Sequence, residues 1–167
     1  DAGRVWQVVS RAGVAWLFER DNGRIGGSAG AAARAMAADG RKFTGADYID
    51  ALERVAALRR GVAELFAGID LILTPTAAAL PWPAEVPYPD QIAGRPAGPR
   101  DHAIFTGFVN ITGLPAISLP VAVSASRLPI GVQFVAGFGS DADLLAFSHS
   151  FSARHPAPAL PQLEPTP

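Results

Sequence analysis

The sequence predicts an α/β fold, a mixed β-sheet with flanking helices. Apolar residues recur at helical spacing near the amino terminus, again after Thr44 and once more after Asp141. Short apolar runs at residues 69–73, 116–123 and 130–136 have the length and bounding turn residues of strands. Helices and strands do not alternate strictly along the chain, so we expect a mixed sheet rather than a purely parallel one.

Length and composition indicate an ordinary globular protein. The 167 residues suffice for one domain with a real core, so we expect a single domain or part of one. The 14 basic and 15 acidic residues nearly balance, which gives no electrostatic case for binding nucleic acid or a membrane. Cysteine is absent, which excludes disulfide and thiolate chemistry, and we expect a cytoplasmic protein. No signal peptide is visible, and an aspartate at position 1 suggests a processed, cleaved or subcloned chain.

Three regions are expected along the chain: a helical segment at residues 1–43, an α/β region at 44–155 and a proline-rich tail at 156–167. In the first region, apolar spacing predicts a helix from residue 2 to about residue 21, with Trp6 and Trp16 packed in the core. An alanine-rich helix follows at about residues 31–38.

Thr44 begins the clearest helix, because Thr44 and Asp47 have the spacing of a capping box in its acidic form. This helix is expected to end at Gly68, followed by a buried strand at residues 69–73. The next segment, residues 77–100, is rich in proline and glycine and too long for an ordinary connection, which is typical of functional or disordered loops.

The region after this loop is expected to contain a helix from Asp101 to Thr112, capped by Asp101 and ended by Gly113 in a left-handed conformation. Strands at residues 116–123 and 130–136 are expected to pair antiparallel, because their connection is short. Pro120 indicates a strand end or an edge strand. Asp141 is expected to cap the last helix.

Three blocks of sequence resemble the C-terminal part of the amidase signature family. They are Asp70-Leu-Ile-Leu-Thr-Pro-Thr76, Phe105-Thr-Gly-Phe-Val-Asn-Ile-Thr-Gly-Leu-Pro-Ala-Ile-Ser-Leu-Pro120, and Leu128-Pro-Ile-Gly-Val-Gln-Phe-Val-Ala-Gly137, the last followed by Asp141-Ala-Asp-Leu-Leu145. They occur in the order that the family shows, so residues 44–155 are expected to form an amidase-like C-terminal region of an α/β/α fold. The resemblance implies serine acyl transfer on carboxylic amides without a cofactor, with a triad of two serines and a lysine.

This chain has no convincing candidate for that triad, so no catalytic residue is assigned to it. Ser28 lies in a glycine-rich stretch, but it is not followed by a second serine, and the interpretation preferred is a helix cap. Lys42 is the only lysine, and its polar turn suits a solvated cation better than a buried base. By the resemblance, the triad lies outside the chain, and the chain alone is inactive.

Histidine and metal chemistry have equally little support. The three histidines, His102, His149 and His155, have no spacing that predicts a Ser-His-Asp triad. No metal-ligand pattern and no Walker-type phosphate loop occur, so no metal site and no cofactor are assigned.

Substrate-binding residues are expected where the strand at residues 69–73 ends, because ligands in α/β sheets lie outside strand ends. We assign Thr76, Phe105 and Asn110 to the pocket wall that the family resemblance implies. Gln133 is more simply explained as a surface residue or a brace for a loop.

Three hypotheses follow. The first is the C-terminal portion of an amidase, which binds a small amide in the complete enzyme and packs against a missing core or self-associates. The second is a binding or scaffolding module that keeps the fold without the chemistry. The third, the least supported, is an independent serine hydrolase that uses Ser28. The sequence leaves open whether the complete protein is a hydrolase or part of an amidotransferase.

Overall fold

A computed structural model describes residues 2–21 and 24–159. Its contacts divide the chain into two compact units, Asp1–Val62 and Ala63–Pro167. The helix α4 (Gly45–Phe66) runs through this division, whereas the sequence led us to expect a division at residue 43. Much of the expected proline-rich tail, residues 160–167, lies outside the described residues.

The first unit contains three helices before α4: α1 (Ala2–Arg20), α2 (Arg24–Ser28) and α3 (Ala31–Gly40). Helices α1 and α3 pack closely, and a Cβ on Gly40 would overlap the Arg11 carbonyl oxygen, so glycine is what allows this approach. Ion pairs from Arg11 to Asp39 at 3.4 Å and from Arg41 to Glu19 at 3.2 Å join the same two helices. The predicted helices of this region are confirmed within two residues at their ends.

The capping box at the start of α4 is confirmed. The Asp47 carboxylate accepts hydrogen bonds from the Thr44 amide at 2.8 Å and from the Thr44 hydroxyl at 2.7 Å, while Thr44 Oγ1 accepts from the Asp47 amide at 3.1 Å. These bonds satisfy amide groups that a helix start otherwise leaves without partners.

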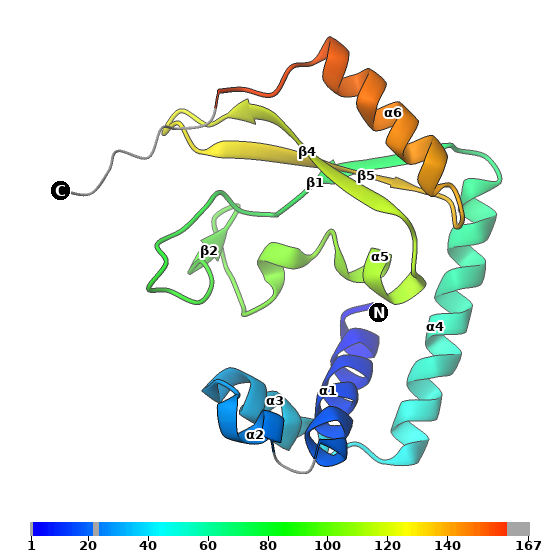
Figure 1. Cartoon of the computed structure of the whole chain (residues 1–167), viewed down its shortest axis with the longest axis vertical. Helices are drawn as coiled ribbons and strands as arrows, with labels where there is room; N and C mark the ends of the chain where they lie inside the picture. The colour runs from blue at the N-terminus through cyan, green and yellow to red at the C-terminus, as the bar shows by residue number, and fades with distance from the viewer. Residues whose placement is uncertain (1, 22–23, 160–167) are drawn as a thin grey trace. The chain divides into compact units, whose positions relative to one another are not determined.

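The second unit is built on a three-stranded sheet of order β1-β5-β4, formed by β1 (Leu71–Pro75), β4 (Ala116–Val123) and β5 (Pro129–Ala136). The helix α6 (Asp141–Arg154) lies on one face of the sheet (Figure 1). Its apolar side chains cover Phe134 and Ala136 of β5, and the Phe134 ring meets those of Phe147 and Phe151 at 4.9 Å. The other face of the sheet carries the candidate site.

The segment between β1 and β4 contains a small hairpin, β2 (Gln91–Ile92) and β3 (Arg95–Pro96), then a 3₁₀ turn, η1 (Asp101–Ala103), and the short helix α5 (Gly107–Thr112). Ala93 and Gly94 both have positive φ, as the tight turn of such a hairpin requires. The left-handed Gly113 is confirmed, with φ 74° and its amide bonded to the Val109 carbonyl at 2.9 Å.

The α/β class with flanking helices is confirmed, and so are β4 and the antiparallel β4–β5 pair. The strand pairings of the described sheets are antiparallel, however, where a mixed sheet was expected. β1 and β4 flank β5 on opposite sides, so the long connection between them brings two strands of the same direction to a common antiparallel partner. Pro120 lies on an edge strand beside a register shift, as expected for a proline in a sheet.

Four local expectations were wrong. The strand after α4 starts at Leu71 and is not fully buried: Leu73 is 61 % exposed, because β1 is an edge strand in the described chain. Trp16 is 55 % exposed and stacks under the Arg20 guanidinium at 5.0 Å instead of packing in a core. The helix expected from Asp101 is interrupted by a turn before Gly107, so Asp101 accepts the Gly98 amide at 2.8 Å instead of capping a continuous helix. Asp141 is the first residue of α6, and Ser140 occupies the cap position.

Among the helices of the described residues, none combines the length and the apolar character needed to cross a membrane.

Candidate functional site

Small polar side chains line the sheet face opposite α6. Gln133 of β5 is buried, and its Nε2 donates hydrogen bonds to Thr74 Oγ1 and to the Phe105 carbonyl, each at 3.0 Å. Thr74 and Ser118 are the register partners of Gln133 on the two neighbouring strands. Gln133 therefore fixes the segment before α5 to the sheet, which confirms loop bracing and removes the interpretation as a surface residue.

A pocket of about 560 Å³ lies where this face ends, beyond β1. At its floor, Thr76 Oγ1 and Ser118 Oγ form a hydrogen bond of 2.5 Å between residues that are 42 positions apart. A Cβ on Gly131 would lie 2.8 Å from the Thr76 hydroxyl oxygen, so only glycine leaves room for this pair. The Thr76 amide donates to the Gly131 carbonyl at 3.1 Å and holds the end of β1 in place.

The wall of the pocket is the first part of the long loop, from Ala77 to Trp82. The Ala78 amide donates to the His102 carbonyl at 2.9 Å, and the indole Nε1 of Trp82 donates to the Val86 carbonyl at 2.9 Å. The rings of Trp82 and His102 pack with their centroids 4.9 Å apart. The loop is thus held by specific contacts within its own unit, which is what a preformed binding wall requires.

The structure brings only one of the three expected binding residues to this pocket. Thr76 lines it, whereas Phe105 and Asn110 do not. Phe105 is half-buried and contributes its carbonyl to Gln133, and Asn110 is exposed near the end of α5, with no side-chain hydrogen bond to the described residues. The roles assigned to these three residues in substrate binding stay predictions.

Two residues of the pocket floor were missed, and the sequence contains a signal for each. Ser118 alternates with Ile117 and Leu119, so strand periodicity places its side chain opposite the apolar face that packs against α6. Gly131 lies inside an apolar strand, where glycine often marks a close approach of other groups.

Ser28 and Lys42 lie in polar surroundings of the first unit. Ser28 is the last residue of α2, not a helix cap as expected; its exposed hydroxyl donates back to carbonyls of its own helix. Lys42 is exposed and donates to Asp39 Oδ1 at 2.6 Å, so it is a solvated cation as expected. The Lys42 ammonium, through this bond and its charge, lowers the pKa of the Asp39 carboxyl below its ordinary value.

The histidines of the described chain form no triad either. His102 packs against Trp82, and its Nδ1 is buried without a hydrogen-bond partner in the described residues. His149 is exposed on α6, where the neighbouring Ser148 hydroxyl turns back to the Leu144 carbonyl at 2.7 Å. Within residues 2–21 and 24–159, no group of three or more His, Asp or Glu side chains has the arrangement of a metal site.

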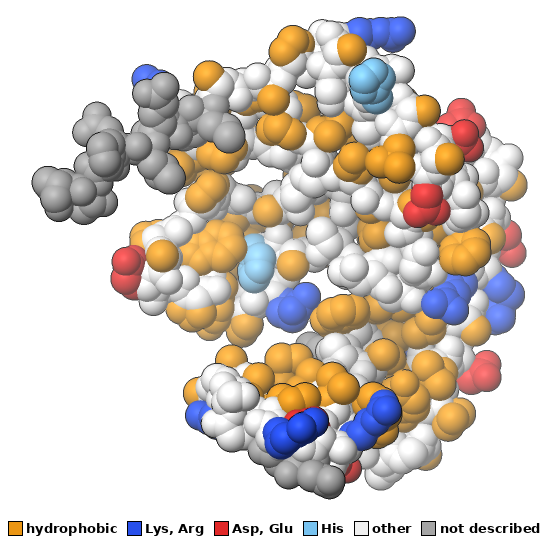
Figure 2. All heavy atoms as spheres, viewed as in Figure 1, with side chains coloured by type: hydrophobic (Ala, Val, Ile, Leu, Met, Phe, Trp, Pro, Cys, Tyr) orange, Lys and Arg blue, Asp and Glu red, His pale blue; other side chains and the backbone are white. Residues whose placement is uncertain are grey.

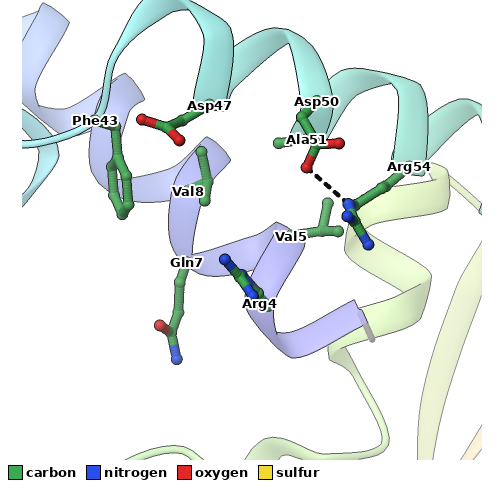
Figure 3. A pocket seen from close by; sticks show the side chains of 9 residues that line it. All are labelled: Arg4, Val5, Gln7, Val8, Phe43, Asp47, Asp50, Ala51 and Arg54. Carbon is green, nitrogen blue, oxygen red and sulfur yellow. Dashed lines mark hydrogen bonds and ion pairs between the residues drawn. The ribbon is translucent and has the colours of Figure 1, made fainter.

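A second, smaller pocket of about 140 Å³ lies between α1 and the first turns of α4 (Figure 3). Its charged lining residues already serve the helix: Asp47 belongs to the capping box, and Arg54 bonds to Asp50 at 2.8 Å. These interactions lower the pKa of Asp47, mainly through its hydrogen bonds from Thr44, and raise the pKa of Arg54 through Asp50. The pocket is therefore explained by how α4 begins.

The sequence of residues 22–145 matches the family model described as Amidase. The chain belongs to the amidase family. It is 38 % identical over 110 residues to a putative amidase AmiC of Mycobacterium leprae, a match that covers 64 % of this chain and 23 % of the relative. It is 39 % identical over 95 residues to one polypeptide of the mitochondrial glutamyl-tRNA(Gln) amidotransferase of Bos taurus, covering 56 % of this chain and 17 % of that protein.

A solved amidase structure has the same fold. It superposes with a TM-score of 0.83 at 24 % sequence identity and covers 93 % of this amidase-family chain, but only 36 % of the solved chain. The chain thus spans less than a quarter of the curated relatives it matches. The pocket beside Thr76 and Ser118 lies within the matched residues.

Proposed function

We propose that this chain is the C-terminal portion of an amidase that hydrolyses carboxylic amides by serine acyl transfer. The match of residues 22–145 to the amidase family is the observation that carries the proposal. In the complete enzyme, the chain supplies part of the sheet and a wall of the substrate pocket. The reaction needs no cofactor, and the protein acts in the cytoplasm.

The Ser-Ser-Lys triad, in this proposal, lies outside the chain, which alone is inactive. A serine hydroxyl attacks an amide only when a positioned base removes its proton. The only lysine of the chain, Lys42, is 74 % exposed and paired with Asp39, so it lacks the burial that would make it a base. Ser28 bonds to carbonyls of α2 and has no basic side chain as a partner within the described residues.

Thr76, Phe105 and Asn110 contact the substrate in the complete enzyme. Thr76 has the best support because it lines the pocket at the end of β1, and Phe105 is held near the same face of the sheet through Gln133. Linear amides are the substrate class proposed. Neither nucleic acid nor a membrane is a partner of this segment.

The chain packs against the remainder of the complete protein or against a second copy of itself. Large apolar side chains stand exposed on several elements, among them Ile49 at 60 %, Leu73 at 61 % and Leu145 at 63 %. Apolar side chains are widespread on the visible surface in Figure 2. Exposed apolar surface of this extent is typical of interfaces.

The experiment that tests the proposal is an assay of the complete protein encoded by the source gene. Release of ammonia or amine from simple amides is expected, and an alanine in place of Thr76, Phe105 or Asn110 should raise KM or lower kcat/KM. Absence of amide hydrolysis by a folded complete protein would overturn the proposal. Unchanged kinetics after one of the three substitutions would remove that residue from the site.

The second candidate is a binding or scaffolding module that retains the fold without the chemistry. The exposed, paired Lys42 fits this candidate equally well. The reading frame around Asp1 separates the two: an upstream coding region with a lysine and a serine pair favours the amidase, and a frame that begins near Asp1 favours the module.

A further inference from the structure

We infer that the pocket beside Thr76 and Ser118 binds an uncharged, mainly apolar amide and excludes carboxylates and amino acids such as glutamine. This inference rests on the proposed function, because it names the substrate class of the same site. It bears on the choice between a hydrolase of apolar amides and an enzyme that takes the amide of glutamine.

The first observation is the charge of the lining. Of the described residues that line the pocket, not one has an ionisable side chain; prolines and alanines predominate, with Leu80, Trp82 and Ile130 as the larger apolar members. A carboxylate or ammonium group that enters such a pocket loses water without gaining an opposite charge. An aromatic or aliphatic group, in contrast, gains free energy as its apolar surface leaves water.

The second observation is the pair of hydroxyls at the floor. Thr76 and Ser118 bond to each other at 2.5 Å, and neither hydroxyl has another hydrogen-bond partner among the described residues. One O–H is used in the mutual bond, so the pair keeps one O–H donor and several acceptor lone pairs. A carboxamide offers the complement, a carbonyl that accepts and an N–H that donates. A carboxylate can only accept, and it brings a full charge.

The third observation is that the pocket exists without a ligand. The loop wall is held by the Ala78 bond to the His102 carbonyl, by the Trp82 indole bond to Val86, and by the packing of Trp82 on His102. The volume, about 560 Å³, lies in the range of small-molecule sites and suffices for a phenyl ring with a short amide chain. A preformed wall spares a ligand the cost of ordering the loop.

The test uses the isotope-labelled 167-residue chain and three probes in NMR titrations. Phenylacetamide and phenylacetate have nearly the same shape and differ in charge, and L-glutamine carries an amide on a zwitterion. Phenylacetamide is expected to shift the amide signals of Ala78, Ser118 and Gly131, and to bind at least about tenfold more tightly than phenylacetate or L-glutamine, because neither charged probe regains its lost hydration. Equal or tighter binding of either charged probe overturns the inference, as do phenylacetamide shifts confined to residues outside the pocket.

The role of the hydroxyls is tested with the double variant Thr76→Val, Ser118→Ala. It should bind phenylacetamide about threefold to tenfold more weakly, because a hydrogen bond to the amide is lost. Ser126→Ala is the matched control, since it removes one member of another hydroxyl pair, Ser124 and Ser126 at 2.9 Å, outside the pocket. Unchanged affinity of the double variant overturns the assignment of the hydroxyls, and the comparison of probes on the unmodified chain needs no variant.

Binding is measured here without hydrolysis, so the two proposals fail separately. If the complete protein hydrolyses amides but this pocket does not prefer the uncharged probe, only the inference on substrate class falls. If the preference is found and the complete protein hydrolyses no amide, the proposed function falls and the pocket is a binding site of another kind.

Discussion

Gln133 is the residue that connects the sheet to the segment before α5. Its amide is buried and donates to the Thr74 hydroxyl and the Phe105 carbonyl, so two elements far apart in sequence depend on one side chain. Buried polar groups that lose their partner cost more than the bond itself was worth.

Replacement of this glutamine by leucine should therefore destabilise the second unit. Gln133→Leu leaves the Phe105 carbonyl without its donor, and we expect a loss of about 1–3 kcal/mol in the free energy of unfolding, measured by urea denaturation. Gln91→Leu is the matched control, because Gln91 is exposed on β2, and it should change stability by less than about 0.5 kcal/mol. Equal effects of the two substitutions would show that the brace contributes nothing.

The capping box makes the start of α4 sensitive to acid. Hydrogen bonds from Thr44 lower the native pKa of Asp47, whereas the unfolded chain keeps the ordinary value, so the unfolded state binds more protons in acid. The stabilisation by Asp47 is thus present above about pH 4 and is lost as the pH falls through the native pKa.

The variant Asp47→Asn should consequently be less stable than the parent at neutral pH, and this difference should shrink in acid, as followed by circular dichroism at a series of pH values. Glu53→Gln, an exposed substitution on the same helix, serves as control. A stability difference that is constant from neutral to acid pH would contradict the linkage.

At the scale of elements, the contact of α1 with α3 depends on the absence of a side chain at Gly40. A Cβ there would overlap the Arg11 carbonyl oxygen and lie 2.9 Å from the Ala15 Cβ, and backbone atoms cannot rotate away. The ion pairs that join the two helices are exposed and contribute little by comparison.

Two glycine substitutions should therefore have opposite effects on thermal stability. Gly40→Ala should destabilise the first unit by about 1–3 kcal/mol through overpacking. Gly61→Ala, inside α4 with open space around it, should stabilise the helix by about 0.5–1 kcal/mol. Stabilisation by both substitutions would mean that α1 and α3 do not approach as described.

Local signals in the sequence predicted single elements well. The Thr44–Asp47 box, the left-handed Gly113 and the apolar run of β4 each act within a few residues, so the sequence alone located them. The long loop was the limit: a proline-rich segment has no periodicity that shows which sheet face it covers. Phe105 was expected in the pocket for this reason, and Ser118 was missed although its alternation with Ile117 and Leu119 indicated the correct face.

At the scale of the whole molecule, exposed apolar surface is the property that the proposed role explains. Ile49, Leu73 and Phe138, the last of them 84 % exposed, would be covered in a complete enzyme. The isolated 167-residue chain should therefore self-associate with rising concentration in analytical ultracentrifugation and should bind a hydrophobic dye. A strictly monomeric chain that binds no dye would argue against a covered surface.

The most direct measurement is covalent labelling of the complete protein with a fluorophosphonate, followed by mass mapping of the labelled serine. The account predicts one labelled serine outside residues 1–167, and an unchanged mass for the 167-residue chain treated alone. A label on a serine of this chain, Ser28 above all, would contradict the central claim that the nucleophile lies elsewhere.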